Sequence, residues 1–516
     1  MKAAGSVKLL FSKKLLLCAA LVFLFGCQST PQYPDKTPTY AFKQQTQSAL
    51  FQSLKADLET HSGLTGVVPL SDGVDALIAR LALVKAATSS IDLQYYIYRA
   101  DESGKLLLWH LLEAAERGVR VRLLLDDMAL KGADNSLVML VSHHNIDVRL
   151  YNPSFERHFR TLAFINHFSR LNHRMHNKSL TIDNTLTVVG GRNIGNEYFS
   201  NNADVDFGDF DLVAVGDVVN EVSQQFDLYW NADLTVDINA LTDIQITTLQ
   251  LAEAKVEVEQ YKLQHSDSAY IKRLLSSQLI AQIEDQTLPW YWGKAQLVYD
   301  QPDKQHHQSE TDNILADLSL FLAQAKRDVI IVSPYFVPTR AGAASLIKAV
   351  ESGLEVTVIT NSLAATDVLA VHAGYRTYRQ QLLEAGVKLY EVKADLELSK
   401  RNGSSWSGSS KSSLHAKTFI IDSSAIFVGS FNFDPRSAWL NTEMGLIIKN
   451  QTLATGVFNG ITDNLVSKTY RLSVLDDEVV WHNDETQQVM FSEPDSGLWR
   501  QFLVDCIALL PIESQL

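Results

Sequence analysis

The sequence is poor in cysteine, has no long apolar run and carries fewer basic than acidic residues. Its three cysteines are Cys18, Cys27 and Cys506, which excludes a disulfide framework and a cysteine-based metal site as organising features. The formal net charge of −14 argues against a nucleic-acid partner, because nucleic-acid affinity comes largely from Lys and Arg side chains that neutralise phosphates. The remaining composition is typical of a globular protein.

The N-terminal segment has the features of an export signal. Lysines 2, 8, 13 and 14 precede the uncharged apolar residues 15–25, and Gly26 and Cys27 follow. This apolar run is shorter than the roughly 20 residues that a membrane-spanning helix needs, which favours a cleaved signal over the alternative of a retained anchor helix. Residues 24–27 resemble a bacterial lipobox, in which the cysteine is lipidated and becomes the first mature residue.

This segment sets the expected location. We expect a protein of the bacterial cell envelope, lipid-anchored through Cys27 and facing the periplasm. Gln28, rather than Asp, follows the cysteine, which favours the outer membrane over the inner membrane.

Beyond residue 65 the same α/β pattern occurs twice. The first copy predicts strands over residues 91–98, 119–125 and 145–151 with a helix over 104–117, and the second predicts strands over 329–332, 355–360 and 385–390 with a helix over 343–351. Short β-branched runs that alternate with helical stretches indicate an α/β sandwich. The repeat divides the chain into two such halves, which we expect to be related by a pseudo-twofold axis with a single active site between them.

The expected organisation has six segments. They are a signal peptide (1–26), a tether rich in Gln, Ser, Thr and Pro (27–65), a first α/β half (66–232), a helical connector without motifs (233–288), a second α/β half (289–472) and a C-terminal extension (473–516).

Each half contains one copy of the pattern HxKx4Dx6GxxN. The first copy is His176, Lys178, Asp183, Gly190 and Asn193, and the second is His415, Lys417, Asp422, Gly429 and Asn432. One short match would be weak evidence, because such patterns occur by chance. Two complete copies at the same point of a duplicated unit, with their histidines 415 − 176 = 239 residues apart, are strong evidence for a shared site.

These residue types suit phosphodiester chemistry. Residues i and i+2 of a strand share a face, so we expect each motif His and Lys to point into one cleft. Lys and Asn donors around a phosphate stabilise the charge of a phosphoryl-transfer transition state, while one imidazole attacks phosphorus and the other moves protons. The candidate catalytic residues are therefore His176, Lys178, Asn193, His415, Lys417 and Asn432. No metal-ligating cluster stands out, and no cofactor is expected.

Four acidic residues are expected to support this site. A nucleophilic His needs a partner on its second ring nitrogen, and Asp211 and Glu443 are the candidates for orienting His176 and His415, respectively. The alternative is that both are surface charges at strand starts. Asp183 and Asp422 follow apolar strands, where a turn cap or a buried ion pair is the simpler interpretation.

The residues around both motifs resemble the phospholipase D superfamily and, within it, the bacterial cardiolipin synthases of the C type. The resemblance rests on the duplicated motif and on segments 171–178, 333–338, 429–437 and 510–513, and it extends from about residue 66 to residue 516. It implies a metal-independent reaction in two steps through a phosphohistidine, with His176 as the nucleophile and His415 as the acid and base.

The resemblance also implies substrates and a location at a membrane surface. In this family a phosphatidyl group moves from a phospholipid to a hydroxyl of phosphatidylglycerol and gives cardiolipin, with phosphatidylethanolamine as a further candidate substrate. The acceptor alcohol and the need for a partner protein stay open. Alternatives are a phospholipase D that hydrolyses phospholipids to phosphatidic acid, a superfamily nuclease, which the acidic charge disfavours, and a non-catalytic lipid-binding scaffold, which the intact motifs disfavour.

One further segment points to lipid. Residues 155–174 contain four arginines among four phenylalanines. They are expected either to bind anionic headgroups or to form a helix packed over the site.

Overall fold

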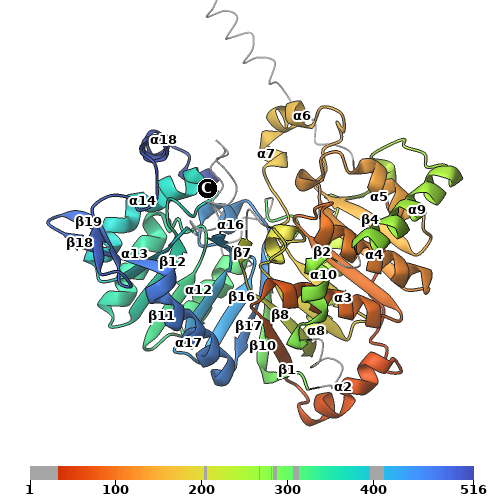
Figure 1. The fold of residues 1–516 in the computed structure, drawn as a ribbon, viewed down its shortest axis with the longest axis horizontal. Coiled ribbons are helices and arrows are strands. Elements are labelled where there is room, and N and C mark those ends of the chain that lie inside the picture. Colours follow the sequence, from red (N-terminus) through yellow and green to blue (C-terminus); the bar gives the residue numbers. More distant parts are fainter. Residues whose placement is uncertain are drawn as a thin grey trace, which may run out of the picture.

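A computed structural model describes residues 33–202, 206–265, 268–279, 282, 287–305, 313–394 and 412–516. Within these ranges the chain forms two α/β halves that lie side by side (Figure 1). The expected signal peptide and Cys27 lie outside the described residues.

The elements of half 1 and the connector follow one another along the chain from α2 to α10. The strands are β1 (Thr65–Leu70), β2 (Ser90–Tyr95), β3 (Arg120–Asp126), β4 (Ile146–Tyr151), β5 (Ser179–Ile182), β6 (Leu186–Gly190), β7 (Asp206–Gly208), β8 (Asp211–Gly216) and β9 (Thr235–Asp237). The helices are α2 (Ala49–Thr60), α3 (Gly73–Ala86), α4 (Glu102–Glu116), α5 (Asp134–Val141), α6 (Arg160–Asn166), α7 (Phe168–Leu171), α8 (Val218–Trp230), α9 (Thr248–His265) and α10 (Ala269–Leu275).

The elements of half 2 repeat this arrangement from β10 onward. The strands are β10 (Tyr291–Tyr299), β11 (Asp328–Val332), β12 (Glu355–Asn361), β13 (Lys388–Val392), β14 (Ser412–Leu414), β15 (Thr418–Ile421), β16 (Ala425–Gly429), β17 (Met444–Lys449), β18 (Thr469–Leu475), β19 (Glu478–Asn483) and β20 (Gln488–Met490). The helices are α12 (Ile314–Leu322), α13 (Thr339–Glu351), α14 (Leu369–Glu384), α16 (Pro435–Trp439), α17 (Gln451–Lys468) and α18 (Leu498–Ala508).

The two sheets have the same strand order. Half 1 runs β1, β8, β6, β5, β2, β3, β4, β9, and half 2 runs β10, β17, β16, β15, β11, β12, β13, β18, followed by β19 and β20. The neighbours β2, β3 and β4 pair parallel, as do β11, β12 and β13, and the other neighbours pair antiparallel. The expected duplication of an α/β unit is confirmed.

The halves join through equivalent strands. β1 and β10 occupy the same place in their sheets and pair antiparallel, with Gly66 opposite Trp292. A strand that pairs antiparallel with its own counterpart generates a twofold relation, so the halves are related by a pseudo-twofold axis. A second connection is the parallel pair of β7 from half 1 and β14 from half 2.

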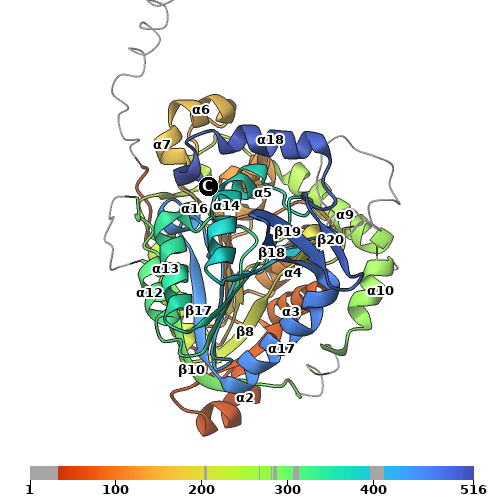
Figure 2. The same cartoon turned by 90° about the vertical axis from the view of Figure 1, so that its left-hand side faces the viewer.

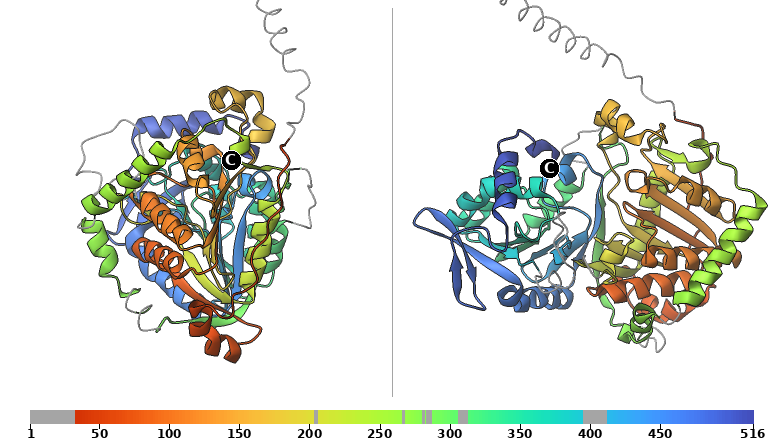
Figure 3. Two further views of the ribbon diagram at one scale, coloured as in Figure 1. Left: turned by 90° about the vertical axis from the view of Figure 1, so that its right-hand side faces the viewer. Right: turned by 45° about the horizontal axis from the view of Figure 1, so that its top comes forward.

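The three largest apolar cores among the described residues follow from this arrangement. In half 1, α3, α4 and α5 pack on one face of the sheet, and in half 2, α12, α13 and α14 do the same; Figure 3 (left) shows the helices of half 1 with α9 lying across them. The third core lies between the halves, where β6 and β8 meet β16 and β17 with residues such as Val189, Leu212, Val428 and Leu446. Burying each such side chain stabilises the fold by about 1.5–3 kcal/mol, so the junction between the halves is itself a core.

The expected tether is wrong for residues 33–64, because these residues contact half 1. The Lys36 ammonium donates to the carbonyls of Ala232 and Thr235, and the backbone N–H of Thr39 donates to Asn231. The segment ends in α2, which Ser48 caps by accepting from the Phe51 N–H. Polar composition does not distinguish a free linker from a segment whose backbone is bonded to a neighbouring domain.

The segment boundaries also differ from those expected. β9 pairs with β4, so half 1 continues past residue 232, and the connector proper contains α9 and α10. In the expected C-terminal extension, β19 and β20 continue the second sheet and α18 packs on α14. No helix among the described residues is long and apolar enough to cross a membrane.

Candidate active site

Both HxK motifs lie at the junction of the halves, immediately before a central strand. His176 and Lys178 precede β5, and His415 and Lys417 precede β15. Our expectation that they lie on the strands is therefore wrong. Each Lys ammonium turns back and donates to the carbonyl of its own motif histidine. All four side chains are more than 90% buried.

His176 of half 1 is held by half 2. Its backbone N–H donates to the carbonyl of Thr442 (2.8 Å), and its Nδ1 lies 2.8 Å from Oε2 of Glu443. The carboxylate fixes the proton on Nδ1, which leaves Nε2 with the lone pair that a nucleophile needs.

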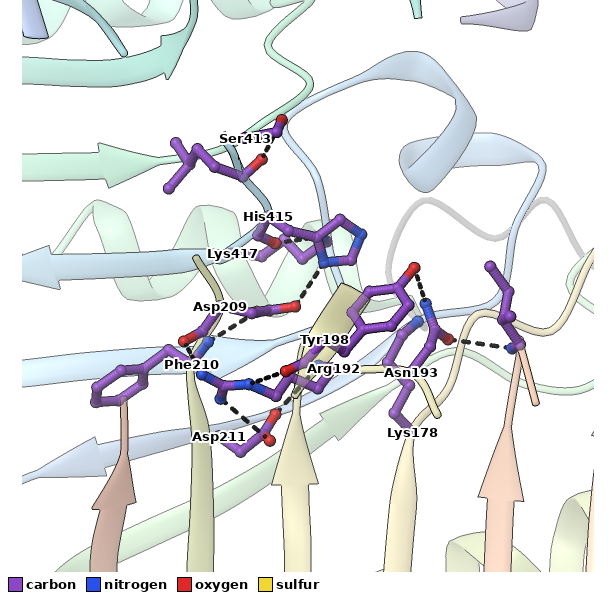
Figure 4. Close-up of polar contacts among 12 residues, drawn as sticks. Lys178, Arg192, Asn193, Tyr198, Asp209, Phe210, Asp211, Ser413, His415 and Lys417 are labelled. Carbon is purple, nitrogen blue, oxygen red and sulfur yellow. Dashed lines mark hydrogen bonds and ion pairs between the residues drawn. The ribbon is translucent and has the colours of Figure 1, made fainter. Parts of the chain in front are cut away.

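His415 of half 2 is held by half 1 in the same manner. Its backbone N–H donates to the carbonyl of Gly208 (2.8 Å), and its Nδ1 lies 2.5 Å from Oδ2 of Asp209. Figure 4 shows His415 and Asp209 directed toward each other, with Lys178 rising from the end of a nearby strand. Because each histidine takes its carboxylate from the other half, neither half contains a complete site.

The expected orienting acids are thus partly wrong. Glu443 contacts His176 rather than His415, and Asp209, not Asp211, is the acid of half 1 that contacts a histidine, namely His415. The sheet register explains the error: Gly190 pairs with Asp211 and Gly429 with Gly445, so the counterpart of Glu443 lies two residues before Asp211. A shift by two residues preserves the alternation of a strand, and for this reason the sequence pattern did not reveal it.

Asp211 has a structural role instead. Its carboxylate accepts from the buried guanidinium of Arg80 (2.9 Å) and from the backbone N–H of Arg192 (3.1 Å). Arg192 in turn donates to the carbonyl of Asp209 (2.6 Å). Asp211 therefore supports the loop that carries the acid beside His415.

The two motif asparagines differ in their contacts. Asn193 accepts from the backbone N–H of Ile97 (3.1 Å) and donates to the hydroxyl of Tyr198 (3.0 Å). The side-chain oxygen of Asn432 is buried and has no hydrogen-bond partner among the described residues. Tyr198 also lies with its ring edge on His415, at 5.2 Å between ring centroids, so Asn193 and His415 share one aromatic support.

Burial controls the charge of the site. It lowers the pKa of His176 to about 4, an effect that Lys178 reinforces and Glu443 opposes. Burial and Lys417 lower the pKa of His415. Burial also lowers the pKa of Lys178 to about 7 and that of Lys417 to about 8. In this state His176 is neutral at pH 7, and an anionic phosphate that enters the site would favour the charged form of both lysines.

The motif aspartates are turn caps away from the histidines, which is one of the two structural roles that we expected. Asp183 accepts from the backbone N–H groups of Thr88, Ser89 and Ser90, and Asp422 accepts from those of residues 326–328. Each holds the turn that leads into the adjacent strand, β2 or β11. Among the described residues no group of three or more His, Cys, Asp or Glu side chains is arranged to hold a metal ion.

Comparison with known proteins agrees with this geometry. A family model described as the PLD-like domain of cardiolipin synthase matches residues 81–230 and 318–459, one match in each half. The chain is 40% identical over 462 residues to cardiolipin synthase C of Escherichia coli (strain K12), covering 88% of this chain and 96% of that protein. It is 28% identical over 425 residues to a cardiolipin synthase of Staphylococcus aureus (strain Mu50 / ATCC 700699), covering 82% of this chain and 71% of that protein.

A solved structure shares the fold. The phosphatidylserine synthase of Haemophilus influenzae Rd KW20 superposes with a TM-score of 0.57 at 13% identity, over 90% of this chain and 100% of that chain. Together with the family match in both halves, these findings show that the chain belongs to the cardiolipin synthase family of PLD-like proteins and is an enzyme of the phospholipase D phosphatidyltransferase type.

Proposed function

We propose that this enzyme moves a phosphatidyl group from a donor phospholipid to a hydroxyl of phosphatidylglycerol and so makes cardiolipin, through a phosphohistidine on His176. The observation that supports this most directly is the exchange of carboxylates between the halves, because it assembles two oriented imidazoles in one site. The family resemblance supports phosphatidylglycerol as acceptor, and phosphatidylglycerol or phosphatidylethanolamine as donor.

The first step forms a covalent intermediate. Nε2 of His176 attacks phosphorus, the bond from phosphorus to the headgroup oxygen breaks, and His415 gives a proton to the departing alkoxide. In this proposal Lys178, Lys417 and the motif asparagines stabilise the phosphate oxygens in the transition state.

The second step releases the product. His415 accepts a proton from the glycerol hydroxyl of phosphatidylglycerol, the hydroxyl oxygen attacks phosphorus, and the bond from phosphorus to His176 breaks. Water at the same position would give phosphatidic acid, so the acceptor decides between transfer and hydrolysis.

The assignment of His176 as nucleophile is supported by how its carboxylate is held. Glu443 accepts from the hydroxyls of Ser430 and Ser437 and therefore has little freedom to move. A group that forms and breaks a covalent bond gains most from a fixed orientation.

The test is an acid-free quench during turnover with phosphatidylglycerol labelled in its phosphate. We expect the label on the peptide that contains His176, and labelled cardiolipin among the products. Label on His415 instead would reverse the roles of the two histidines. Turnover without any protein-bound label would contradict the covalent mechanism, and phosphatidic acid as the sole product would favour hydrolysis.

We also propose that the mature enzyme is lipid-anchored through Cys27 in the bacterial cell envelope and faces the periplasm, at the outer membrane in preference to the inner. The basic residues, the short apolar run and Cys27 support this proposal. Mass spectrometry of the mature N-terminus tests it. A diacylated Cys27 is expected, and an unmodified Cys27 in a membrane-bound protein would indicate a retained anchor helix.

A further inference from the structure

Two short helical segments present exposed apolar side chains on the same side of the molecule. Residues 159–171 form α6 and α7 and expose Phe159, Leu162 and Ile165. In half 2, α18 exposes Leu498, Trp499 and Phe502, with Leu498 85% exposed. Figure 2 shows that α6, α7 and α18 lie together along one edge of the protein. We call these six residues the apical surface.

The arginines beneath the first segment are engaged within the protein. Arg157 and Arg160 form ion pairs with Asp127 and Asp134. These arginines therefore do not form an outward cationic face, and they instead fix the segment to half 1 with its apolar residues outward. Of the two roles expected for residues 155–174, this geometry favours packing onto the body over headgroup binding by arginine.

The second segment is fixed to half 2 in an equivalent place. The guanidinium of Arg500 in α18 donates to the carbonyl of Leu363 (2.8 Å) and to that of Thr366. The loop that contains these carbonyls follows β12, as the loop with Asp127 follows β3, and these strands are counterparts. The apical surface thus has one part on each half, at positions related by the pseudo-twofold axis.

Both parts are connected to the active site by short paths. Asn172, directly after α7, accepts from Arg436 and donates to Gln515 (2.9 Å), and His176 follows four residues later (176 − 172). On the other side, Asn361, the last residue of β12, is bonded to Leu414, which precedes His415. The apical surface therefore flanks the site from both halves.

The start of the described chain lies beside the same surface. Tyr33 packs on Phe155 at 5.9 Å between ring centroids, and Phe155 lies next to Arg170, the residue before the end of α7. Cys27 precedes Tyr33 by 33 − 27 = 6 residues, a length that spans at most about 20 Å when fully extended. A lipid on Cys27 would therefore be held within that distance of Tyr33.

We propose that the apical surface docks into the interfacial region of a phospholipid bilayer and so holds the active site against the bilayer surface. The three residues of half 1 and the three of half 2 would contact the bilayer on either side of the site. This proposal rests on the proposed function, in which both substrates are bilayer lipids. Apolar and aromatic side chains on short helices insert at the boundary of headgroups and acyl chains. Because the arginines are paired internally, docking is mainly apolar and depends little on salt.

The test compares three triple variants of the mature chain, which begins at residue 27 and carries Cys27→Ser so that no attached lipid contributes. Two variants change the apical surface: Phe159→Ser with Leu162→Ser and Ile165→Ser, and Leu498→Ser with Trp499→Ser and Phe502→Ser. The matched control changes equally exposed residues of α9, Leu249→Ser with Val256→Ser and Leu263→Ser. Flotation with vesicles of phosphatidylglycerol and phosphatidylethanolamine is measured at low and high salt, together with turnover on vesicles and on dispersed short-chain lipid.

We expect each apical variant to lose at least about tenfold in vesicle binding, with a parallel loss of turnover on vesicles. Turnover on dispersed lipid and the behaviour of the α9 control should match the unchanged chain. Apical variants that still float, or binding that high salt abolishes, would overturn the proposal. If the Cys27→Ser chain without a triple substitution does not float with vesicles, the bilayer is not the partner, and the apical surface would be assigned to a protein partner instead. No turnover on dispersed lipid by any chain would refute the proposed function, while flotation would still test the surface.

Discussion

The two halves carry equivalent acids but hold them by different means. In half 2, Glu443 is fixed at both ends: hydroxyls donate to its carboxylate, and its backbone N–H and carbonyl are both bonded to Asp300, which pairs with Lys304. In half 1, Asp209 accepts from the N–H of Phe210, and its loop is held from below by Arg192.

The residues that lie beside Glu443 and Asp209 also differ between the halves. Position 430 is a serine whose hydroxyl donates to Glu443. Its counterpart, Gly191, has no space for a side chain, because a Cβ there would lie 2.2 Å from the Asp209 carboxylate. The longer acid is thus fixed by an extra donor, and the shorter acid has closer contact with the backbone. The comparison teaches that a duplicated site can keep the same contact between acid and histidine while the contacts that hold the two acids in place diverge. This difference suits His176 to covalent attack and His415 to proton transfer.

The sharpest test of the different roles of His176 and His415 is the removal of each side chain. His176→Ala and His415→Ala should each lower kcat by at least about 10⁴-fold, because neither half supplies a complete site. The phosphohistidine quench separates them: His415→Ala should still accumulate a slowly formed adduct on His176, and His176→Ala should form none. Near-normal turnover by either variant would contradict a shared site.

Neutralising the exchanged acids should have the next largest effect. Glu443→Gln and Asp209→Asn are expected to lower kcat by about 10²- to 10⁴-fold, because each histidine loses the partner that sets its tautomer. Because Glu443 orients the proposed nucleophile His176, Glu443→Gln should reduce adduct formation. Because Asp209 orients the proposed acid His415, Asp209→Asn should reduce protonation of the leaving group. Single-turnover kinetics with donors of different leaving-group pKa distinguish the two steps.

Asp211→Asn is the matched control for these variants. It removes the acid that our sequence interpretation placed beside a histidine, but it leaves both histidine contacts in place. Arg80 and Arg192 would lose their buried partner, so we expect a loss of roughly 3 kcal/mol in stability with kcat of the folded protein largely kept. A loss of kcat as large as that of Asp209→Asn at unchanged stability would contradict the assignment.

A change of pH should alter kcat/KM gradually and by less than the substitutions of the catalytic residues. Protonation of His176 removes the nucleophile, so kcat/KM should fall toward acid only near its lowered pKa of about 4, tenfold per pH unit below it. Toward alkali, His415 loses the proton that it gives to the leaving group, at a pKa that burial lowers, and Lys178 and Lys417, whose pKa values are about 7 and about 8, lose their charge. Both losses should lower kcat/KM. An acid limb at the ordinary histidine pKa near 6.5 would mean that His176 is not the buried neutral base.

The smallest difference between the halves should appear at the turn caps. Asp183 is buried and accepts from two hydroxyls as well as three backbone N–H groups, whereas Asp422 is half-buried. We expect Asp183→Ala to cost about 2–3 kcal/mol and Asp422→Ala about 1 kcal/mol, measured as shifts in thermal unfolding. Both have positive φ, 51° and 53°, a backbone conformation that Asn tolerates, so the Asn variants should be milder. Equal losses at both positions would show that burial does not decide the cost.

Sequence periodicity located most of the fold, because local patterns carry it. The strand predicted over residues 119–125 corresponds to β3 and the helix over 104–117 to α4, each within two residues at either end. The motif residues were found because their spacing is repeated without a gap. Residues 33–64 were misjudged because many of their contacts are made by backbone groups, such as the N–H of Thr39 and the N–H of Ala41, which leave no pattern in composition.

The sequence by itself determined that this protein has two α/β halves and which histidines, lysines and asparagines form its repeated motif, since spacing and alternation along one chain are local properties. Only the tertiary structure decided which acid serves which histidine. The pairing of β1 with β10 and of β7 with β14 brings residues from opposite halves together. A register shift by two residues makes Asp209, not Asp211, the counterpart of Glu443, and it leaves every local sequence pattern unchanged. Contacts that cross a pseudo-twofold axis join residues more than 200 positions apart, such as His415 and Asp209 (415 − 209 = 206), and no periodicity in the sequence records them.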